Sequence, residues 1–185
     1  MSRPGRATML QVVAPLLAIA IVLVVCRVRG LPLRQTLALR LPTARMAVIW
    51  TVAFCILIAV EEWVSRTQLG LTIDRWDLSS PAVQLSLRVV AMVVLAPVGE
   101  ELVFRGLMFD QVSRGAAGVW GAVVLSAAAF AVLHGQYGVA ALSLIFIDGL
   151  FLGAARAASG SVLLPMGLHA LGNAYAAAQR LRVVS

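Results

Sequence analysis

The feature that most constrains this chain is a series of apolar segments, each close to the length that spans a membrane. A helix needs roughly 20 apolar residues to cross the hydrocarbon layer. The chain of 185 residues is 61% hydrophobic and only 12% charged, whereas soluble domains are about one-quarter charged. We therefore predict an all-α, polytopic membrane helix bundle with about six transmembrane helices, at residues 9–27, 46–64, 82–111, 118–134, 138–156 and 161–179.

The segments form a single predicted membrane domain, residues 1–185, with two irregular parts. The 82–111 segment is too long for one straight span, and Pro97 is expected to kink or break it. Residues 28–45 mix arginines, leucines and two prolines, which is typical of a basic connection at the headgroup level; an ordinary basic loop is an equal alternative. The 9–27 segment lacks a small-residue cleavage site, so we interpret it as a retained signal anchor.

The charge and the cysteines restrict the possible partners. The net charge of +7 comes from arginines, which are common at membrane edges. Basic and aromatic residues are not interleaved, so we predict a lipid bilayer and no nucleic acid as partner. Cys26 and Cys55 lie in apolar runs and are too few for a disulfide framework or a thiolate metal site.

The arginine-only composition is typical of a bacterial plasma-membrane protein. The predicted connections on the two sides of the membrane carry seven and six arginines, and these counts fix no orientation.

The segment "GEELVFRG", residues 99–106, places three charges inside an apolar segment. An ionisable group at membrane depth is costly and indicates a functional site by default. Glu101 and Arg105 are four residues apart on one helix face, so they are expected to pair. Glu100 lies about 140° around the helix from Arg105 and is left without that partner. It is thus available as a general base, although a buried Glu–Arg pair can also be purely structural.

The chain has two histidines, His134 and His169, and both lie in apolar segments. The turn at 113–118 is about equidistant in sequence from Glu100 and His134, so on antiparallel helices both reach a depth of about 25 Å from that turn. Asn173 follows His169 by four residues on the same helix face. We predict that these four side chains converge from three helices; the alternative is that each histidine is a hydrogen-bonded core residue.

A second stretch, "EEWVSR", repeats the same acidic and basic spacing at residues 61–66. It lies at the end of the second apolar segment and is followed by Thr67 and Gln68. We therefore interpret Glu61, Glu62 and Arg66 as solvated or headgroup-facing. The spacing alone is not specific to a site.

Asp148 is a further carboxylate at membrane depth, in "LSLIFIDGLFLG". It is expected either to pair with Arg156 at a helix end or to line a cavity. Gly149 and Gly153 match the small-x-x-x-small pattern that lets membrane helices approach closely.

Three motifs resemble the CPBP intramembrane protease family, also called the CAAX prenyl protease 2 or Abi family. They are "EELVFRG" (100–106), "FAVLH" (130–134) and "HALGN" (169–173). The family pattern is Glu-Glu-x-x-x-Arg, Phe-x-x-x-His and His-x-x-x-Asn, in this order on successive membrane helices. The resemblance covers about residues 82–179, which it marks as a protease-like catalytic core.

This resemblance implies an intramembrane endopeptidase acting on a peptide or protein substrate at the membrane. It implies that Glu100 and His134 activate a water, that His169 and Asn173 stabilise the oxyanion, and that Glu101, Arg105 and Phe130 support the site. The family name suggests a prenylated CAAX substrate, but most bacteria lack that class of substrate.

Three alternatives to a metal-free glutamic protease remain open. Two histidines and one glutamate are a known catalytic zinc set, but a separate base is then needed and there is no His-Glu-x-x-His. We therefore predict no metal and no cofactor, with a zinc-dependent protease as the alternative. A non-proteolytic scaffold or immunity-type protein is the second alternative. A proton-coupled transporter is the third, although the internal repeats that favour it are absent.

Overall fold

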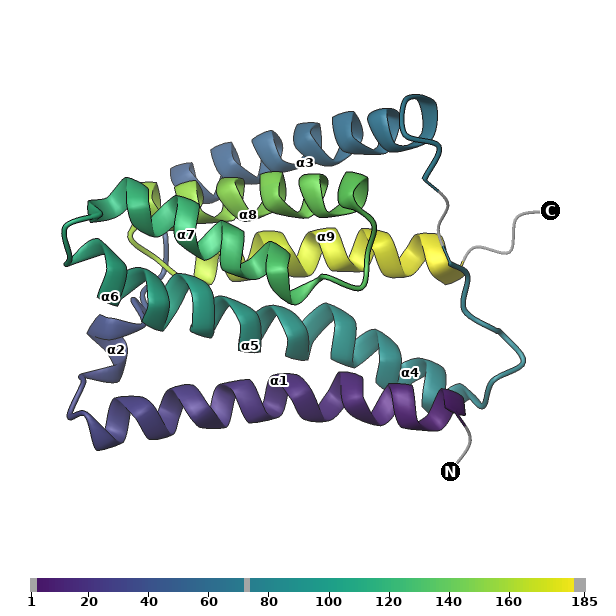
Figure 1. The fold of residues 1–185 in the computed structure, drawn as a ribbon, viewed down its shortest axis with the longest axis horizontal. Helices are drawn as coiled ribbons and strands as arrows, with labels where there is room; N and C mark the ends of the chain where they lie inside the picture. Colours follow the sequence, from purple (N-terminus) through teal and green to yellow (C-terminus); the bar gives the residue numbers. More distant parts are fainter. Residues whose placement is uncertain (1–2, 72–73, 182–185) are drawn as a thin grey trace.

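The computed structural model describes residues 3–71 and 74–181, and within these ranges the chain is helical (Figure 1). Each of the six predicted segments forms a helix, so the all-α bundle is confirmed. The elements are α1 (Arg3–Val28), the short α2 (Leu33–Thr36), α3 (Ala44–Thr67), one continuous helix over residues 82–113, α7 (Gly118–Leu133), α8 (Val139–Ser159) and α9 (Leu163–Leu181).

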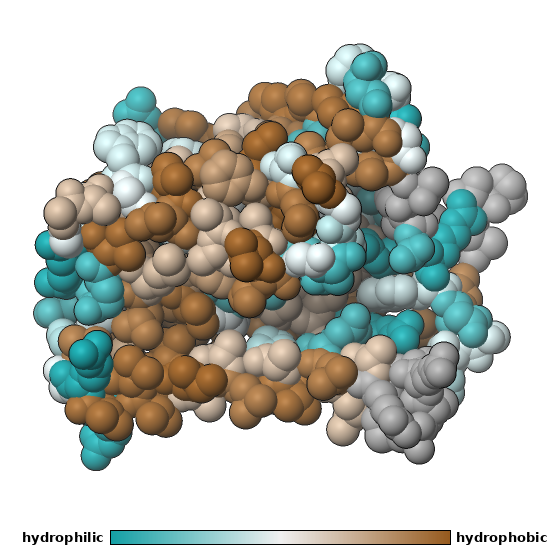
Figure 2. Space-filling view, in the orientation of Figure 1, coloured by the Kyte–Doolittle hydropathy of each residue, from teal (hydrophilic) through white to brown (hydrophobic). Residues whose placement is uncertain are grey.

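Helix length and composition make this an integral membrane protein. Among the residues that the structure describes, four helices are long and apolar enough to cross a membrane: Ala7–Val28, Ala44–Thr67, Ala82–Ser113 and Val139–Ser159. The α7 helix is apolar but shorter, and α9 carries the polar side chains of His169 and Asn173. On the face shown in Figure 2, hydrophobic residues cover the flank of the bundle and hydrophilic residues gather towards its two ends.

The 82–113 helix is continuous but irregular. It consists of α4 (Ala82–Val90), a π-helical segment η1 (Ala91–Leu95), α5 (Ala96–Glu101), a second π-helical segment η2 (Leu102–Met108) and α6 (Phe109–Ser113). Of the two outcomes expected at Pro97, a kink or a break, the break is therefore wrong. Proline has no N–H to donate, and the π-helical turn directly before it accommodates this gap without ending the helix.

Glycines allow two close helix contacts near the centre of the bundle. A Cβ on Gly149 of α8 would lie 3.0 Å from the Cα of Ala127 in α7, which confirms the predicted close approach. A Cβ on Gly99 would lie 2.9 Å from the carbonyl oxygen of Pro15 in α1. The residue that precedes Glu100 is thereby held directly against α1.

The 28–45 connection folds onto one end of the bundle. Leu37 is buried there in a cluster with Val22, Cys26, Leu102 and Val162. The carbonyl of Ala38 accepts a hydrogen bond from the Val162 amide at 3.1 Å, and Arg40 Nε donates to the Gly160 carbonyl at 2.6 Å. The middle of the connection thus packs on the turn between α8 and α9, while all its arginines are exposed.

Candidate active site

A cavity of about 780 Å³ lies in the half of the bundle towards the 134–138 loop. Residues from all three sequence motifs line it: Glu100, His134, His169 and Asn173. The predicted convergence of these four side chains is therefore observed. They come from three separate stretches of chain: α5, the residue that follows α7, and α9.

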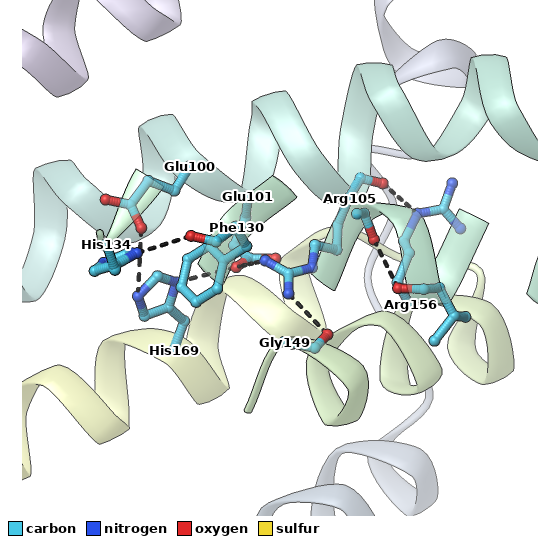
Figure 3. Close-up of polar contacts among 10 residues, drawn as sticks. Glu100, Glu101, Arg105, Phe130, His134, Gly149, Arg156 and His169 are labelled. Carbon is cyan, nitrogen blue, oxygen red and sulfur yellow. Dashed lines mark hydrogen bonds and ion pairs between the residues drawn. The ribbon is translucent and has the colours of Figure 1, made fainter. Parts of the chain in front are cut away.

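Behind the cavity, Glu101 and Arg105 form the ion pair that their spacing predicts. Both side chains have no exposed surface, and Arg105 Nη1 donates to Glu101 Oε1 at 2.9 Å. Arg105 Nη2 donates to the Gly149 carbonyl of α8 at 2.8 Å (Figure 3). The pair therefore joins the 82–113 helix to α8 as well as neutralising one of the two carboxylates.

The hydrogen bond of His169 shows which of its ring nitrogens is the donor. Its Nδ1 lies 3.0 Å from Glu101 Oε1, the oxygen that also accepts from Arg105. Because a carboxylate oxygen accepts, Nδ1 is the donor. The other ring nitrogen, Nε2, is left 3.8 Å from Glu100 Oε2. The His169 ring thus connects the paired glutamate to the unpaired one.

His134 is held in the same way by a different acceptor. It follows the last residue of α7, and its Nδ1 lies 2.9 Å from the carbonyl oxygen of Phe130. A carbonyl can only accept, so Nδ1 carries the hydrogen and Nε2 of the neutral ring has a free lone pair. Both imidazoles lie close enough to Glu100 to act on its charge, and Figure 3 shows the Glu100 carboxylate beside the two rings.

Phe130 packs at the centre of this arrangement. Its ring centroid is 4.8 Å from that of His134 and 5.5 Å from that of His169. The guanidinium carbon of Arg105 lies 4.8 Å from the Phe130 ring centroid on a third side. Only 4% of Phe130 is exposed, so this apolar ring is buried against both imidazoles and the Arg105 guanidinium.

Asn173 reaches the cavity but also contacts the 82–113 helix. Its Nδ2 donates to the carbonyl of Met92, in the first π-helical segment, at 2.7 Å. One of its two amide hydrogens is thereby used, and the other remains for a ligand. The contact joins α9 to the segment that precedes the glutamates.

The interpretation of Glu61 as solvated or headgroup-facing is wrong. Glu61 lines the cavity and interacts with the carboxyl group of Asp148 on α8. The physical reason is that α3 packs against α8 and α9, which turns one face of α3 inward. Phe54, Ile58 and Glu61 lie on that face and all line the cavity, so their spacing of four and three residues was the available signal.

The other charged residues of the 61–66 stretch are Glu62 and Arg66. Glu62 also lines the cavity, but it pairs with Arg66 and accepts a hydrogen bond from Gln179 at 2.9 Å. Arg66 is 60% exposed, which agrees with its expected position. Of the two alternatives for Asp148, lining the cavity is correct. Pairing with Arg156 is wrong, because Arg156 instead donates to the Arg105 carbonyl.

The arrangement does not fit a metal centre. Within residues 3–71 and 74–181, no three His, Cys, Asp or Glu side chains are placed to hold a metal ion. Glu101 is committed to Arg105, so it does not supply the separate base that a zinc centre needs. We therefore derive no catalytic step through a metal.

Comparison with known proteins places these motifs in one family. Residues 81–175 match the family described as Rce1-like type II CAAX prenyl endopeptidases. The chain is also 37% identical over 95 residues to an Escherichia coli protein described as "Uncharacterized 24.3 kDa protein", a match that covers 50% of this chain and 43% of that protein. No solved structure matches the chain. The family match contains all three motifs and covers half of the sequence, and the chain therefore belongs to the Rce1-like type II CAAX prenyl endopeptidase family.

Proposed function

We propose that this protein is an intramembrane endopeptidase that hydrolyses a peptide bond with a water activated by Glu100 and His134. The observation that carries the proposal is the environment of the Glu100 carboxylate. Its Oε2 is buried and has no hydrogen-bond partner among the residues described, although two imidazoles lie beside it. A partly exposed carboxylate that faces a cavity without an arginine partner is arranged to act on a ligand rather than to hold helices together.

The hydrogen bonds of His134 define how the water is held. Water in the cavity donates one hydrogen to Glu100 and the other to Nε2 of His134, whose Nδ1 hydrogen is held by the Phe130 carbonyl. A lone pair of the water oxygen is then directed at the carbonyl carbon of the substrate. As the new C–O bond forms, Glu100 takes one proton from the water, and the carbonyl oxygen becomes an oxyanion.

The oxyanion requires donors, and two side chains supply them in this proposal. His169 donates from Nε2, which lies 3.8 Å from Glu100 Oε2, when this nitrogen carries a hydrogen. Asn173 donates the amide hydrogen that Met92 does not use. The tetrahedral intermediate then collapses as Glu100 returns its proton to the amide nitrogen and the C–N bond breaks. One water is consumed, and a carboxylic acid and an amine are released.

The substrate in this proposal is a membrane-associated peptide or protein, and the enzyme acts in a bacterial cell membrane. The family description names CAAX prenyl endopeptidases, but no feature of the cavity selects a prenylated cysteine. The mechanism therefore commits only to the peptide bond and to its position at the membrane. A non-proteolytic scaffold on the same fold is the alternative outcome of the test.

The direct test compares new protein N-termini in membranes from cells that express the wild type or Glu100→Gln. Glutamine has nearly the same shape but cannot accept the proton, so a group of N-termini present with the wild type should be missing with Glu100→Gln. Asp110→Asn is the matched control, because Asp110 lies on the same helix but is paired with Arg114 and does not line the cavity.

Two results distinguish the possible functions. N-termini lost with Glu100→Gln and kept with Asp110→Asn support a protease and identify its substrate. Identical N-termini in all three strains at equal expression contradict proteolysis and favour the scaffold.

Removal of divalent metals should leave this cleavage unchanged. The described side chains form no three-ligand metal group, and the proposed base acts on water directly. The measurement is cleavage at the Glu100-dependent site in purified membranes before and after treatment with a chelator. Cleavage abolished by the chelator and restored by Zn²⁺ would overturn the metal-free mechanism.

A further inference from the structure

The two π-helical segments each leave one backbone carbonyl without its usual helical donor. At the end of the first segment, the Ala96 amide donates to the carbonyl of Ala91 rather than to that of Met92, four residues earlier. At the end of the second, the Phe109 amide donates to the carbonyls of Phe104 and Gly106 rather than to that of Arg105. A skipped carbonyl inside a membrane bundle is costly unless another donor reaches it.

Side chains from other helices bond both skipped carbonyls. Asn173 of α9 donates to Met92 at 2.7 Å. Arg156 of α8 donates from Nε to Arg105 at 2.9 Å (Figure 3). The two bonds lie on either side of α5, which ends with Glu100 and Glu101. The irregular form of the helix at the glutamates therefore depends on donors that are distant in sequence.

Arg156 has no other evident reason to be buried. Only 9% of it is exposed, and no carboxylate in the described part of the chain forms an ion pair with it. Arg40 and Asp110 are the charged groups that act on it, and its guanidinium lies 4.9 Å from the Phe109 ring centroid. A buried cation without an ion-pair partner is expensive, and the bond to the skipped carbonyl is the hydrogen bond that holds its Nε.

The bond connects Arg156 to the active site through Arg105. Helix α8 holds Arg105 at two points: the Gly149 carbonyl accepts from its guanidinium, and Arg156 donates to its carbonyl. Arg105 in turn holds Glu101, and Glu101 holds His169. We propose that Arg156 is a positioning residue, which keeps the second π-helical segment in place and thereby sets the position of Glu100 against His169. The catalytic part of this inference rests on the proposed function.

The first measurement follows the Arg105 carbonyl and does not need a substrate. The chain contains three Arg–Gly pairs, at residues 29–30, 105–106 and 114–115. Protein labelled with ¹³C at the arginine carbonyl and ¹⁵N at glycine gives one NMR correlation for each pair. Arg29→Lys and Arg114→Lys each remove one of them and so assign the third. Arg156→Met should shift the 105–106 correlation, because the carbonyl loses its donor.

The second measurement is the rate of cleavage of a peptide that contains the Glu100-dependent site. Arg156→Met should lower kcat about tenfold or more, as expected for a misplaced catalytic group, and leave KM within about twofold because Arg156 does not line the cavity. Arg156→Lys keeps the charge and a donor, so its 105–106 correlation should shift less than that of Arg156→Met and its kcat should fall less. If Arg156→Met does not fold, the same two measurements are made on Arg156→Lys alone. Arg88→Met is the control, since it loses an arginine Nε bond to the Thr8 hydroxyl at 3.0 Å, and neither residue lines the cavity.

Each contrary result is distinct. An unshifted 105–106 correlation in Arg156→Met, or an equal shift in Arg88→Met, overturns the proposal that Arg156 holds the second π-helical segment. A shifted correlation with unchanged kcat overturns the positioning role in catalysis, as does a rise in KM without a fall in kcat. A wild type without Glu100-dependent cleavage refutes the proposed function instead, while the NMR measurement still decides whether Arg156 holds the helix.

Discussion

Glu100→Gln should slow cleavage at the identified site about a thousandfold, within the range of about 10²–10⁴ for a general base. His134→Phe should cause a loss of similar order, because the water then lacks the acceptor that Nε2 provides. The double variant should be little slower than either single variant. Groups that act on one water as a unit give strongly non-additive losses, so this comparison is sharper than either single change.

The measurement is single-turnover cleavage of the substrate peptide by equal amounts of folded enzyme in detergent or nanodiscs. Asp110→Asn serves as the control for loss of a carboxylate on the same helix, and its rate should remain close to that of the wild type. Losses that multiply in the double variant would mean that Glu100 and His134 act in separate steps. The shared water would then be the wrong description of the site.

The largest effect on stability should come from Arg105→Met. It leaves Glu101 as a fully buried carboxylate without its cation, and breaking a buried pair in this way costs about 3–5 kcal/mol. It also removes the Nη2 donor to the Gly149 carbonyl. Adding Glu101→Gln to Arg105→Met should recover part of the loss, because the unpaired charge is then absent.

A second pair on the same helix provides the control. Arg114 pairs with Asp110 at the same spacing of four residues, but 68% of the Arg114 side chain is exposed. Arg114→Met should therefore lower the free energy of unfolding far less than Arg105→Met does. The free energy of unfolding, measured by denaturant titration in mixed micelles, compares the variants. Equal losses for Arg105→Met and Arg114→Met would show that burial of the first pair does not control stability.

The contacts predicted well from sequence are those within one helix or between neighbouring helices of known length. Glu101 and Arg105 pair because four residues bring side chains to one helix face. Glu100 and His134 line the same cavity because they lie at equal distances along two antiparallel helices from the turn that connects these helices. His169 and Asn173 share a face for the same reason as the ion pair. These relations depend only on helix pitch and rise.

The incorrect expectations concern contacts between elements that are distant in sequence. Glu61 has the same local spacing as Glu100, and only the packing of α3 against α8 and α9 turns it into the cavity. Pro97 was expected to kink or break the helix, and whether the helix breaks there depends on whether other donors compensate for the disturbed backbone. Asn173 supplies one such donor at Met92, and no local pattern contains that contact.

Hydropathy and motif spacing in the sequence determined that the chain is a membrane bundle, which charges lie at membrane depth, and which glutamate has a cation. The physical reason is that the cost of placing an unpaired charge or backbone group in lipid is large and local, so it leaves a pattern in the residues themselves. Only the tertiary structure decided which nitrogen of each histidine is used in a hydrogen bond and how the two π-helical segments are held. Those outcomes depend on single acceptors and donors, such as the Phe130 carbonyl and the Arg156 guanidinium, whose positions are set by the packing of whole helices.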